Sequence, residues 1–382
     1  MVDGAPLRRR NLVRFTAAMV ICAAAAVPVS PVEPEHAAAE RPPLILSFVG
    51  DIMHHELTAE MPDYDRLYDA VRPLLDVDDL SFANIEFPVD PSREPSGYPI
   101  FNGTVEYVEA AIRAGFDVFS LANNHTYDLG ESGVTATRDV FRSLADRAQI
   151  VVSGIRDYPG APLSVTDIRR RGWRIGFLAI TSFSNVWGSD AHINLVNYRD
   201  PVAREQLLDA VRWWRREFDL LIVSVHDGVE YVLSPPSRTV EFFRDLSDAG
   251  VDIVWGHHPH VLQPWEHRNG RVIIYSAGNF VSAQRRHQNP LIPFGRWGPT
   301  GDTAVFQVRA MDRDGHAESR LVRAPVFTTF DHPEHGLVLA TVEQTLVEDM
   351  SLAWRAFYLA RFVFFRGFQR SRAFVELEAA DR

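Results

Sequence analysis

Five short apolar runs of this 382-residue sequence each end in side chains that can bind a metal ion. In chain order, these runs lead to Asp51, Glu86, His125, His226 and the trio His257, His258 and His260. Oxygen donors mixed with imidazoles suit hard or borderline divalent ions such as Mn²⁺, Fe²⁺ or Zn²⁺. The residue types therefore indicate a metal-dependent protein.

The apolar runs alternate with stretches of helical periodicity, which is typical of an α/β domain. Strands are expected at residues 44–50, 80–85, 118–121, 150–152, 174–180, 220–225, 253–255, 272–275 and 303–309. Helices are expected at residues 64–75, 105–114, 132–144, 201–216 and 238–249. Because open α/β folds keep their sites at the carboxyl ends of their strands, we expect the metal-binding side chains to meet along one edge of a sheet.

Asp51 and Glu86 are the carboxylates of the predicted site. A lone aspartate after a strand is more often a helix cap or turn residue, and a lone glutamate is more often paired with an arginine. Side chains alternate along a strand, which places Asn84 and Glu86 on the same side. A carboxylate there would be able to bridge two ions, which lie roughly 3.5–4 Å apart in two-metal hydrolytic sites.

The segment from Asn123 to Asp128 combines a neutral oxygen ligand with a proton donor. Asn123 and Asn124 follow a predicted strand, and His125 comes next. Paired asparagines alone indicate a turn, and Asp128 is also able to cap the following helix. With a strand directly before it, the segment favours the functional interpretation.

The histidines at residues 257–260 give the clearest metal-binding pattern. His258 and His260 lie two positions apart in an extended loop, so they project to one side and are able to bind together. The adjacent His257 leaves the choice of ligands open. A single histidine such as His226 is usually structural, and Asn279 is about equally a pocket residue or a turn residue.

The composition excludes several classes of protein. The formal charge of −11 argues against nucleic acid as the main partner. All 39 basic residues are arginine, so the chain has neither the lysine of a P-loop nor an amine for Schiff-base catalysis. The single cysteine, Cys22, excludes disulfides within the chain and thiolate metal clusters.

Residues 1–39 are expected to be a signal peptide or an N-terminal membrane anchor. A basic start precedes an apolar stretch of small residues, and Ala37–Ala39 offers a cleavage site. Arg9 and Arg10 resemble a twin-arginine signal, which would suit export of a folded, metal-loaded protein. We therefore expect the domain to lie outside the cytoplasm, secreted or anchored at the outer face of the membrane.

Residues 40–335 are predicted to form the metal-binding domain, and residues 336–382 a C-terminal helical extension. Residues 342–374 have helical periodicity with many aromatic and arginine side chains. This pattern fits a helix packed on the domain with its arginines in solvent, which we favour. It also fits a basic amphipathic helix on an anionic membrane surface.

Together the motifs resemble those of the bacterial capsule-synthesis CapA family, the poly-γ-glutamate biosynthesis proteins. The similar segments follow the family's order: FVGDIM, ANIEFPV, SLANNHTYDLGESGV, SVHDGVEY, DAGVDIVWGHHPHVLQPWE and IIYSAGNF. This family is similar to the calcineurin-like metallophosphoesterases, which implies a four-layer α/β/β/α sandwich around two metal ions. The resemblance implies His125 as general acid, Glu86 as bridging ligand, and a ligand set of Asp51, Glu86, Asn124, His226, His258 and His260.

Two positions depart from what the resemblance leads us to expect. Met53 stands where metallophosphoesterases commonly have a histidine, which implies that one metal is held more weakly. Asp227 stands where family members usually have tryptophan, which implies added negative charge beside the site.

Three functions are compatible with these residues. The first is a part in the biosynthesis or export of an anionic capsule polymer, with capsule-synthesis membrane proteins as partners. The second is an exported metal-dependent phosphoesterase unrelated to capsule. The third is a non-catalytic scaffold associated with the membrane.

Overall fold

The computed structural model describes residues 41–370 except 293–294, 333 and 349. The predicted leader, with Cys22, and residues 371–374 of the predicted C-terminal helix lie outside this part. Among the described helices, none combines the length and the apolar character that a membrane crossing needs.

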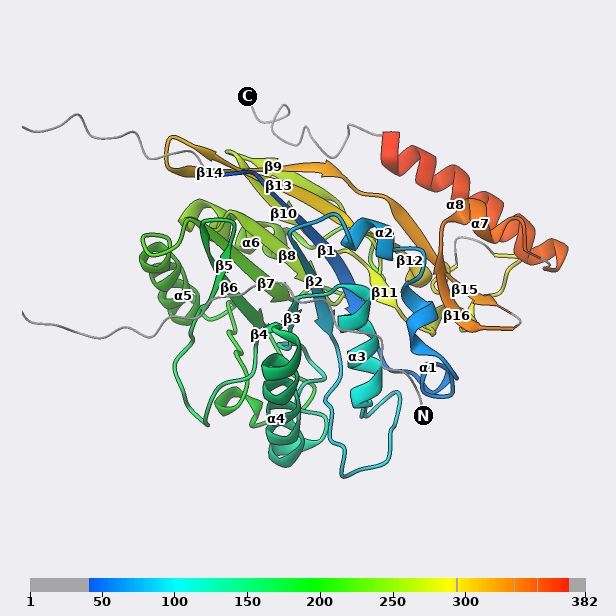
Figure 1. The fold of residues 1–382 in the computed structure, drawn as a ribbon, viewed down its shortest axis with the longest axis horizontal. Coiled ribbons are helices and arrows are strands. Elements are labelled where there is room, and N and C mark those ends of the chain that lie inside the picture. The colour runs from blue at the N-terminus through cyan, green and yellow to red at the C-terminus, as the bar shows by residue number, and fades with distance from the viewer. Residues whose placement is uncertain (1–40, 293–294, 333, 349, 371–382) are drawn as a thin grey trace, which may run out of the picture.

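The first of two large sheets has seven strands (Figure 1). Its strand order is β14-β13-β1-β2-β3-β4, with β11 also paired to β1. Strands β1 to β4 are parallel because helices return the chain between them, whereas β13 and β14 are antiparallel. The bounds are β1 (Leu44–Ile52), β2 (Leu80–Ile85), β3 (Val118–Ser120), β4 (Val151–Ser153), β11 (Asn279–Val281), β13 (Phe306–Arg313) and β14 (His316–Arg323).

The second sheet has six strands in the order β5-β6-β7-β8-β10-β9. Strands β6, β7 and β8 are parallel and in register, so Thr181, His226 and His257 lie side by side at their carboxyl ends. The bounds are β5 (Thr166–Arg170), β6 (Trp173–Thr181), β7 (Leu220–His226), β8 (Ile253–His257), β9 (Trp265–Arg268) and β10 (Arg271–Ile274).

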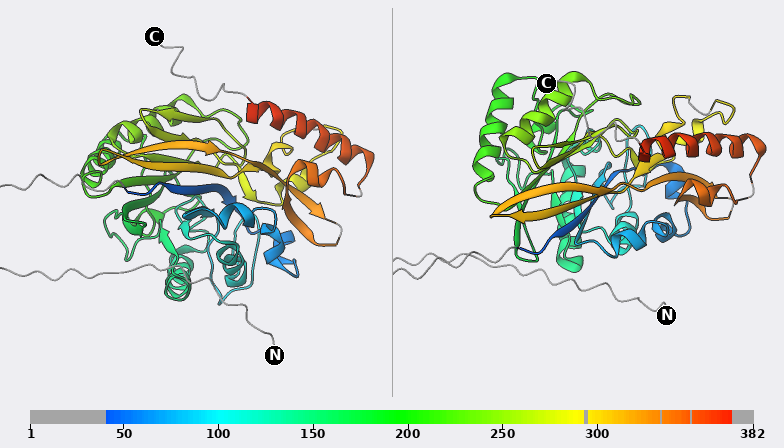
Figure 2. Two further views of the ribbon diagram at one scale, coloured as in Figure 1. Left: turned by 45° about the horizontal axis from the view of Figure 1, so that its top comes forward. Right: turned by 90° about the horizontal axis from the view of Figure 1, so that it is seen from above.

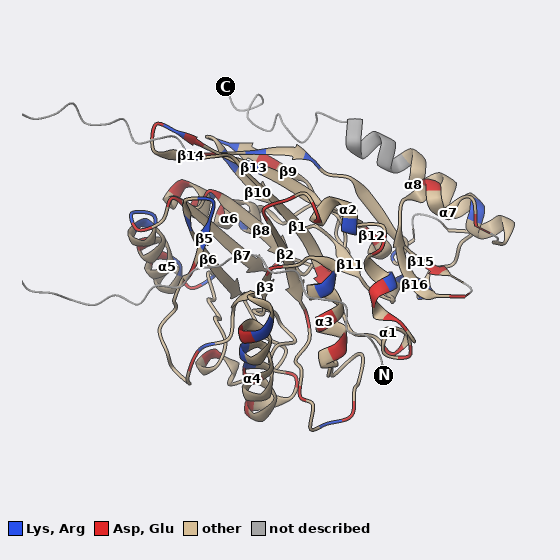
Figure 3. Cartoon of the chain, in the orientation of Figure 1, with Lys and Arg blue, Asp and Glu red and all other residues tan. Residues whose placement is uncertain are grey.

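Helices cover the outer face of each sheet, and the inner faces share one core (Figures 1 and 2). Helices α3 (Val105–Ala114) and α4 (Gly130–Ala148) pack on the first sheet, and α5 (Pro201–Trp214) and α6 (Ser237–Ala249) on the second. Phe48, Phe82 and Trp255 fill the core between the sheets, with ring centroids 4.6 to 6.1 Å apart. Figure 3 shows few charged residues on the strands at the centre of the molecule. The predicted four-layer α/β/β/α sandwich is therefore confirmed.

One predicted helix, at residues 64–75, is divided into two short pieces. The chain forms a 3₁₀ turn at Tyr64–Tyr68 and then the one-turn helix α2 (Arg72–Leu75). Pro73 lies in the first turn of α2, where the backbone N–H has no partner within the helix and its absence costs nothing. In a continuous helix from residue 64 to 75, the same proline would remove a backbone hydrogen bond. Another one-turn helix, α1 (Glu56–Ala59), precedes this region.

A third sheet carries the C-terminal helix α8 (Leu352–Arg370), at the end of the molecule away from α5 and α6 (Figures 1 and 2). It contains β12 (Asp302–Ala304), β15 (Val326–His332) and β16 (Gly336–Ala340). Residues 336–340, which the sequence assigned to a helical extension, thus form a strand. The predicted helix at 342–374 is likewise interrupted between α7 (Val342–Thr345) and α8.

Helix α8 packs on the domain, as the favoured interpretation expects. Phe357 and Tyr358 are buried, and the Tyr358 hydroxyl donates to the Thr329 carbonyl at 3.1 Å. Arg361 corrects one detail, because it is buried and paired with Asp302 instead of lying in solvent.

Candidate metal centre

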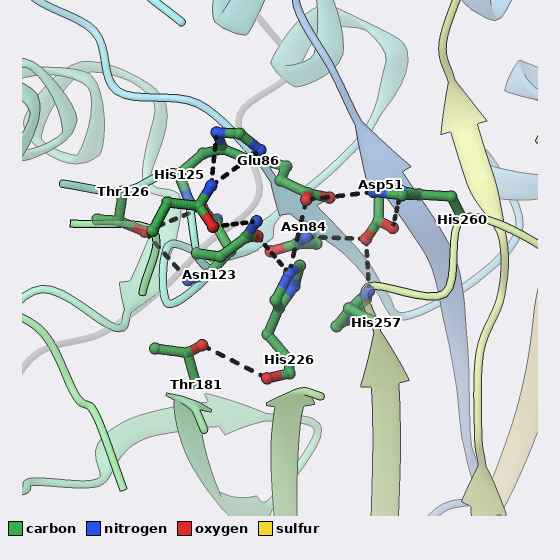
Figure 4. Close-up of polar contacts among 12 residues, drawn as sticks. Asp51, Asn84, Glu86, Asn123, His125, Thr126, Thr181, His226, His257 and His260 are labelled. Atoms are coloured by element: carbon green, nitrogen blue, oxygen red, sulfur yellow. Dashed lines mark hydrogen bonds and ion pairs between the residues drawn. The ribbon is translucent and has the colours of Figure 1, made fainter. Parts of the chain in front are cut away.

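The carboxyl ends of both large sheets meet at one buried place, where the predicted site residues lie (Figure 4). Asp51 is the penultimate residue of β1, and Glu86 directly follows β2. His226 ends β7, and the strands that carry Thr181, His226 and His257 end just below the carboxylates in Figure 4. Residues distant in sequence therefore converge because two sheets share an edge.

A close backbone approach explains the glycine before Asp51. The Asp51 N–H donates to the Gly278 carbonyl oxygen at 3.0 Å. A Cβ at position 50 would lie 1.7 Å from that oxygen, so Gly50 is required where β1 meets β11. This contact brings Asn279, which pairs with Asp51 in the strand register, to the site.

Glu86 belongs to two sets of side chains with the spacing of a metal site. One set is Asp51, Glu86 and His260, and the other is Glu86, His226 and His258. Within each set the ligand atoms lie within 4.8 Å of one another. His260 Nδ1 is 3.3 Å from Asp51 Oδ2, and His226 Nε2 is 3.5 Å from Glu86 Oε1.

Asn124 lies next to the second set. Its Oδ1 is 2.7 Å from His226 Nε2, and the side chain is almost fully buried. The structure thus brings together all six residues that the resemblance implies as ligands.

Several buried polar atoms here have no hydrogen-bond partner among the described residues. They are both carboxylate oxygens of Glu86, Oδ1 of Asn84, Nδ1 of His226, Nε2 of His257 and Nδ1 of His258. Each unpaired buried polar atom costs about 1–3 kcal/mol, so a cluster of them indicates a missing ligand. Converging carboxylate, amide and imidazole lone pairs fit divalent cations.

The two carboxylates have opposite pKa shifts. Burial alone would raise the pKa of Asp51, but hydrogen bonds from His257 and His260 hold it well below its usual value. Burial and the charge of Asp51 raise the pKa of Glu86 well above its usual value. A bound cation would favour the ionised form of Glu86 and remove this conflict.

Burial also favours neutral imidazoles at the site. It lowers the pKa of His226 well below its ordinary value, with a further contribution from His258. Burial, then the proximity of His260, lowers the pKa of His258 to about 3. A neutral imidazole offers the lone pair that a metal ligand needs.

His125 has a carboxylate partner of its own. Its Nδ1 is 2.8 Å from Asp128 Oδ2, a contact that fixes the ring, and its Nε2 has a longer contact of 3.5 Å with Asn185 Nδ2. The ring packs edge-on against Phe101 at 4.7 Å. Asn185 also contacts the ring, with its Nδ2 3.4 Å from His125 Nδ1, and it accepts a hydrogen bond from Asn124. Sequence reasoning missed Asn185 because no apolar run or motif leads to it.

The remaining predicted pocket residues hold the candidate ligands in place. Asn84 donates to Asp51 at 2.9 Å, and His257 Nδ1 is 3.0 Å from the same carboxylate. Asn279 Oδ1 is 2.9 Å from His260 Nδ1. Asn123 donates to the Ile85 carbonyl at 2.7 Å, which ties the His125 loop to the end of β2.

The histidine loop has a strained backbone. His258 has a backbone φ of 95° and His260 a φ of 58°, values that residues other than glycine rarely adopt. Such strain persists only where surrounding contacts impose it, and it clusters at functional sites. Here it accompanies the convergence of both imidazoles on the carboxylates.

Comparison with known proteins identifies the family. The family model described as "Bacterial capsule synthesis protein PGA_cap" matches residues 45–284, a span that contains every residue of the site. The chain belongs to this family. "PGA biosynthesis protein CapA" of Bacillus subtilis (strain 168) is 29% identical over 320 residues, 82% of this chain and 80% of the relative.

Two further similarities were found for this PGA_cap family member. "Capsule biosynthesis protein CapA" of Bacillus anthracis is 29% identical over 290 residues, 72% of this chain and 65% of the relative. The crystal structure of a hypothetical protein from Thermus thermophilus overlaps with a TM-score of 0.43 and 17% identity. That overlap covers 74% of this chain and 100% of the other.

The two departures have different structural settings. Met53 is buried in the core between the first sheet and its helices, so an apolar side chain occupies that position. Asp227 directly follows His226 and is buried. Its carboxylate accepts hydrogen bonds from Ser182, from the Tyr198 hydroxyl at 2.8 Å and from Thr239 at 2.9 Å. The Arg199 guanidinium lies 3.6 Å away, so a cation is close to this carboxylate.

Proposed function

We propose that this PGA_cap protein is a metal-dependent phosphoester hydrolase that acts outside the cytoplasm in the biosynthesis of an anionic capsule polymer. The observation that carries the hydrolase part is Glu86, a buried carboxylate with unpaired oxygens that is shared by two metal-type sets. The family, and relatives whose names refer to PGA and capsule biosynthesis, support the polymer part.

The residues divide between two proposed cation positions. Asp51, Glu86 and His260 would hold one divalent ion, Mn²⁺, Fe²⁺ or Zn²⁺. Glu86, Asn124, His226 and His258 would hold the other. Ions bound in this way supply a nucleophilic water at neutral pH and polarise a phosphoryl oxygen.

The protein's own proton donor is His125. In our proposal, Nε2 donates a proton to the departing oxygen, while Asp128 accepts the Nδ1 hydrogen bond and fixes the tautomer. Asn185 Nδ2 lies 3.4 and 3.5 Å from the two ring nitrogens and further restricts the ring. A non-catalytic scaffold with a structural metal would have no need of this pair, which is why we favour catalysis.

The test combines elemental analysis with turnover of bis(4-nitrophenyl) phosphate. We expect His125→Ala to retain the metal of the wild type but to lose on the order of 10²–10⁴-fold in turnover. The control His258→Ala/His260→Ala is expected to lose metal as well. Failure of the metal-loaded wild type to hydrolyse the ester would reject the hydrolase proposal.

We also propose that the exposed face of helix α8 contacts a membrane surface. Leu352, Leu359 and Val363 are 85%, 53% and 67% exposed, and their spacing places them on one helix face. We expect the full chain to co-sediment with anionic vesicles. Replacing these three residues by glutamine should abolish that binding without unfolding the protein, because their side chains lie mostly in solvent. Unchanged co-sedimentation of the triple variant would exclude α8 as the contact.

A further inference from the structure

Arginines line two hollows, one of which reaches the candidate metal centre. The first hollow, of about 450 Å³, has His258, Glu230, Arg199 and Arg296 in its wall. The second, of about 660 Å³, lies at α5 and α6. Its wall includes Arg199, Arg204, Arg212 and Arg238. Arg199 lines both hollows, so they form one surface that begins at His258.

Two of these arginines have no acidic partner among the described residues. Arg204 pairs with Asp245, and Arg212 with Glu205 and Asp209. By contrast, Arg238 and Arg296 form no ion pair with any carboxylate in the part of the chain that the structure describes. Unpaired arginines are notable in a chain of formal charge −11, because acidic partners are in excess. Their charges are therefore available to a ligand.

Contacts with neighbouring groups hold two of the guanidinium groups in place. Arg296 lies over the rings of Tyr231 and Trp297, 4.5 and 4.8 Å from their centroids. Arg199 is near the Tyr198 ring and 3.6 Å from the buried Asp227 carboxylate. Cation–π contacts of this kind restrict an arginine while leaving its N–H groups free to bind an anion.

Apolar side chains line both hollows together with the arginines. Phe183 and Val229 line the first hollow, and Leu208 and Pro201 line the second. A complementary ligand therefore has anionic groups separated by short apolar links. A polycarboxylate chain has this alternation, whereas an inorganic polyphosphate has no apolar link between its charges.

We propose that Arg296, Arg199 and Arg238 form a binding track for an extended polycarboxylate chain that reaches the metal centre at His258. Each guanidinium binds a carboxylate of the chain through paired N–H···O hydrogen bonds. The proposal rests on the proposed hydrolase function for the reaction at the metal centre. Binding of the polycarboxylate to the protein requires no turnover.

The test measures binding of a fluorescently labelled oligoglutamate to the metal-loaded full chain by anisotropy. We expect Arg238→Gln and Arg296→Gln each to weaken binding by about 5- to 10-fold, and the double variant to weaken it further. The matched control is Arg309→Gln, which makes the same change in net charge. Arg309 is exposed and pairs in register with Ile45, at the end of β1 opposite to Asp51.

Several outcomes would overturn the track. Binding that is absent in the wild type, unchanged in both variants, or equally reduced in the control excludes these arginines as the site. Better competition by polyphosphate than by unlabelled oligoglutamate would assign the surface to a different ligand. Equal competition by free glutamate would exclude recognition of a chain.

The same preparation separates this proposal from the proposed function. Ester turnover without oligoglutamate binding rejects the track and leaves the hydrolase intact. Arginine-dependent binding without turnover keeps the track and rejects the hydrolase.

Discussion

The two large sheets contribute different chemistry to one site. The first sheet supplies oxygen donors at the ends of β1, β2 and β3, namely Asp51, Glu86 and Asn124. The second supplies nitrogen donors at the ends of β7 and β8, namely His226, His258 and His260. Both sets that contain Glu86 draw on both sheets, so Glu86 joins the oxygen donors of the first sheet to the imidazoles of the second.

This division has an energetic meaning. Buried carboxylates are costly without a counter-charge, whereas buried neutral imidazoles cost less because they carry no charge. The raised pKa of Glu86 and the lowered pKa of His226 express the two sides of this difference. A bound cation would neutralise the carboxylates of the first sheet, while the imidazoles of the second sheet would fix the position of the cation. The comparison of the two sheets can be tested by changing one contribution at a time.

The largest effect is expected from Glu86, which contributes to both sets. Glu86→Gln should lose both metal ions, because it removes the shared negative charge, whereas His226→Asn should lose only one. Without the metal ions the transition state would lose several kcal/mol of stabilisation, which lowers turnover on the order of 10³-fold. Elemental analysis and ester hydrolysis measure both quantities. Full metal content in Glu86→Gln would contradict the shared role.

Removal of the metal ions should lower the free energy of unfolding, because the ions join donors from both sheets. A ligand that binds only the folded state at 100 times its Kd stabilises by about 2.7 kcal/mol. We therefore expect Mn²⁺ to raise the free energy of unfolding of the metal-free wild type by about that amount at such a concentration. Glu86→Gln serves as the control and should not respond. An equal response of both proteins would place the stabilising metal elsewhere.

A smaller effect is expected at the opposite end of the second sheet, where Asp252 is buried before β8. Burial outweighs Arg215 and Arg271 and raises the pKa of Asp252 to about 6. The folded pKa thus exceeds the unfolded value of about 3.9. The contribution of Asp252 to stability is therefore complete below about pH 4 and is lost as the pH rises through about 6.

Asp252→Asn should remove this pH dependence. The amide oxygen is able to accept the Leu221 N–H, which Asp252 now accepts at 2.8 Å. The free energy of unfolding of the variant minus that of the wild type should be about 1–2 kcal/mol larger at pH 8 than at pH 4. This is somewhat less than the full pKa shift implies, because Arg215 and Arg271 lose a counter-charge. Denaturant unfolding at the two pH values measures the difference. If the variant and the wild type differ by the same free energy of unfolding at pH 4 and at pH 8, the assigned pKa of Asp252 is contradicted.

The parallel core of the fold is predictable from sequence because its strands are continuous apolar runs. Strand β2 and helix α3 have the bounds that the pattern indicates, and Gly115 ends α3 with φ of 119°. Two outer strands were missed for physical reasons. Strand β14 has Ser319 as its one buried residue and so contains no continuous apolar run, whereas β16 (GLVLA) is apolar but directly precedes a helical pattern.

The candidate site was predicted more completely than its surroundings. The six implied ligands, His125 and the supporting residues all lie together, although their binding of metal stays a prediction. Asn185, the partners of Asp227 and the unpaired arginines were not foreseen. Each acts through contacts with residues distant in sequence, such as Arg199 with Asp227 or Arg296 with Tyr231. Local patterns carry no information about such neighbours.

The placement of the donors on both sheets also governs when an ion can enter. Asp51 emerges early in synthesis and His260 more than two hundred positions later, so the complete set of donors exists only after both sheets have folded. Since sites of mixed oxygen and nitrogen donors select among transition metals largely by supply, the ion acquired would reflect the compartment in which folding finishes. The metal content of the native protein would therefore record where its maturation took place.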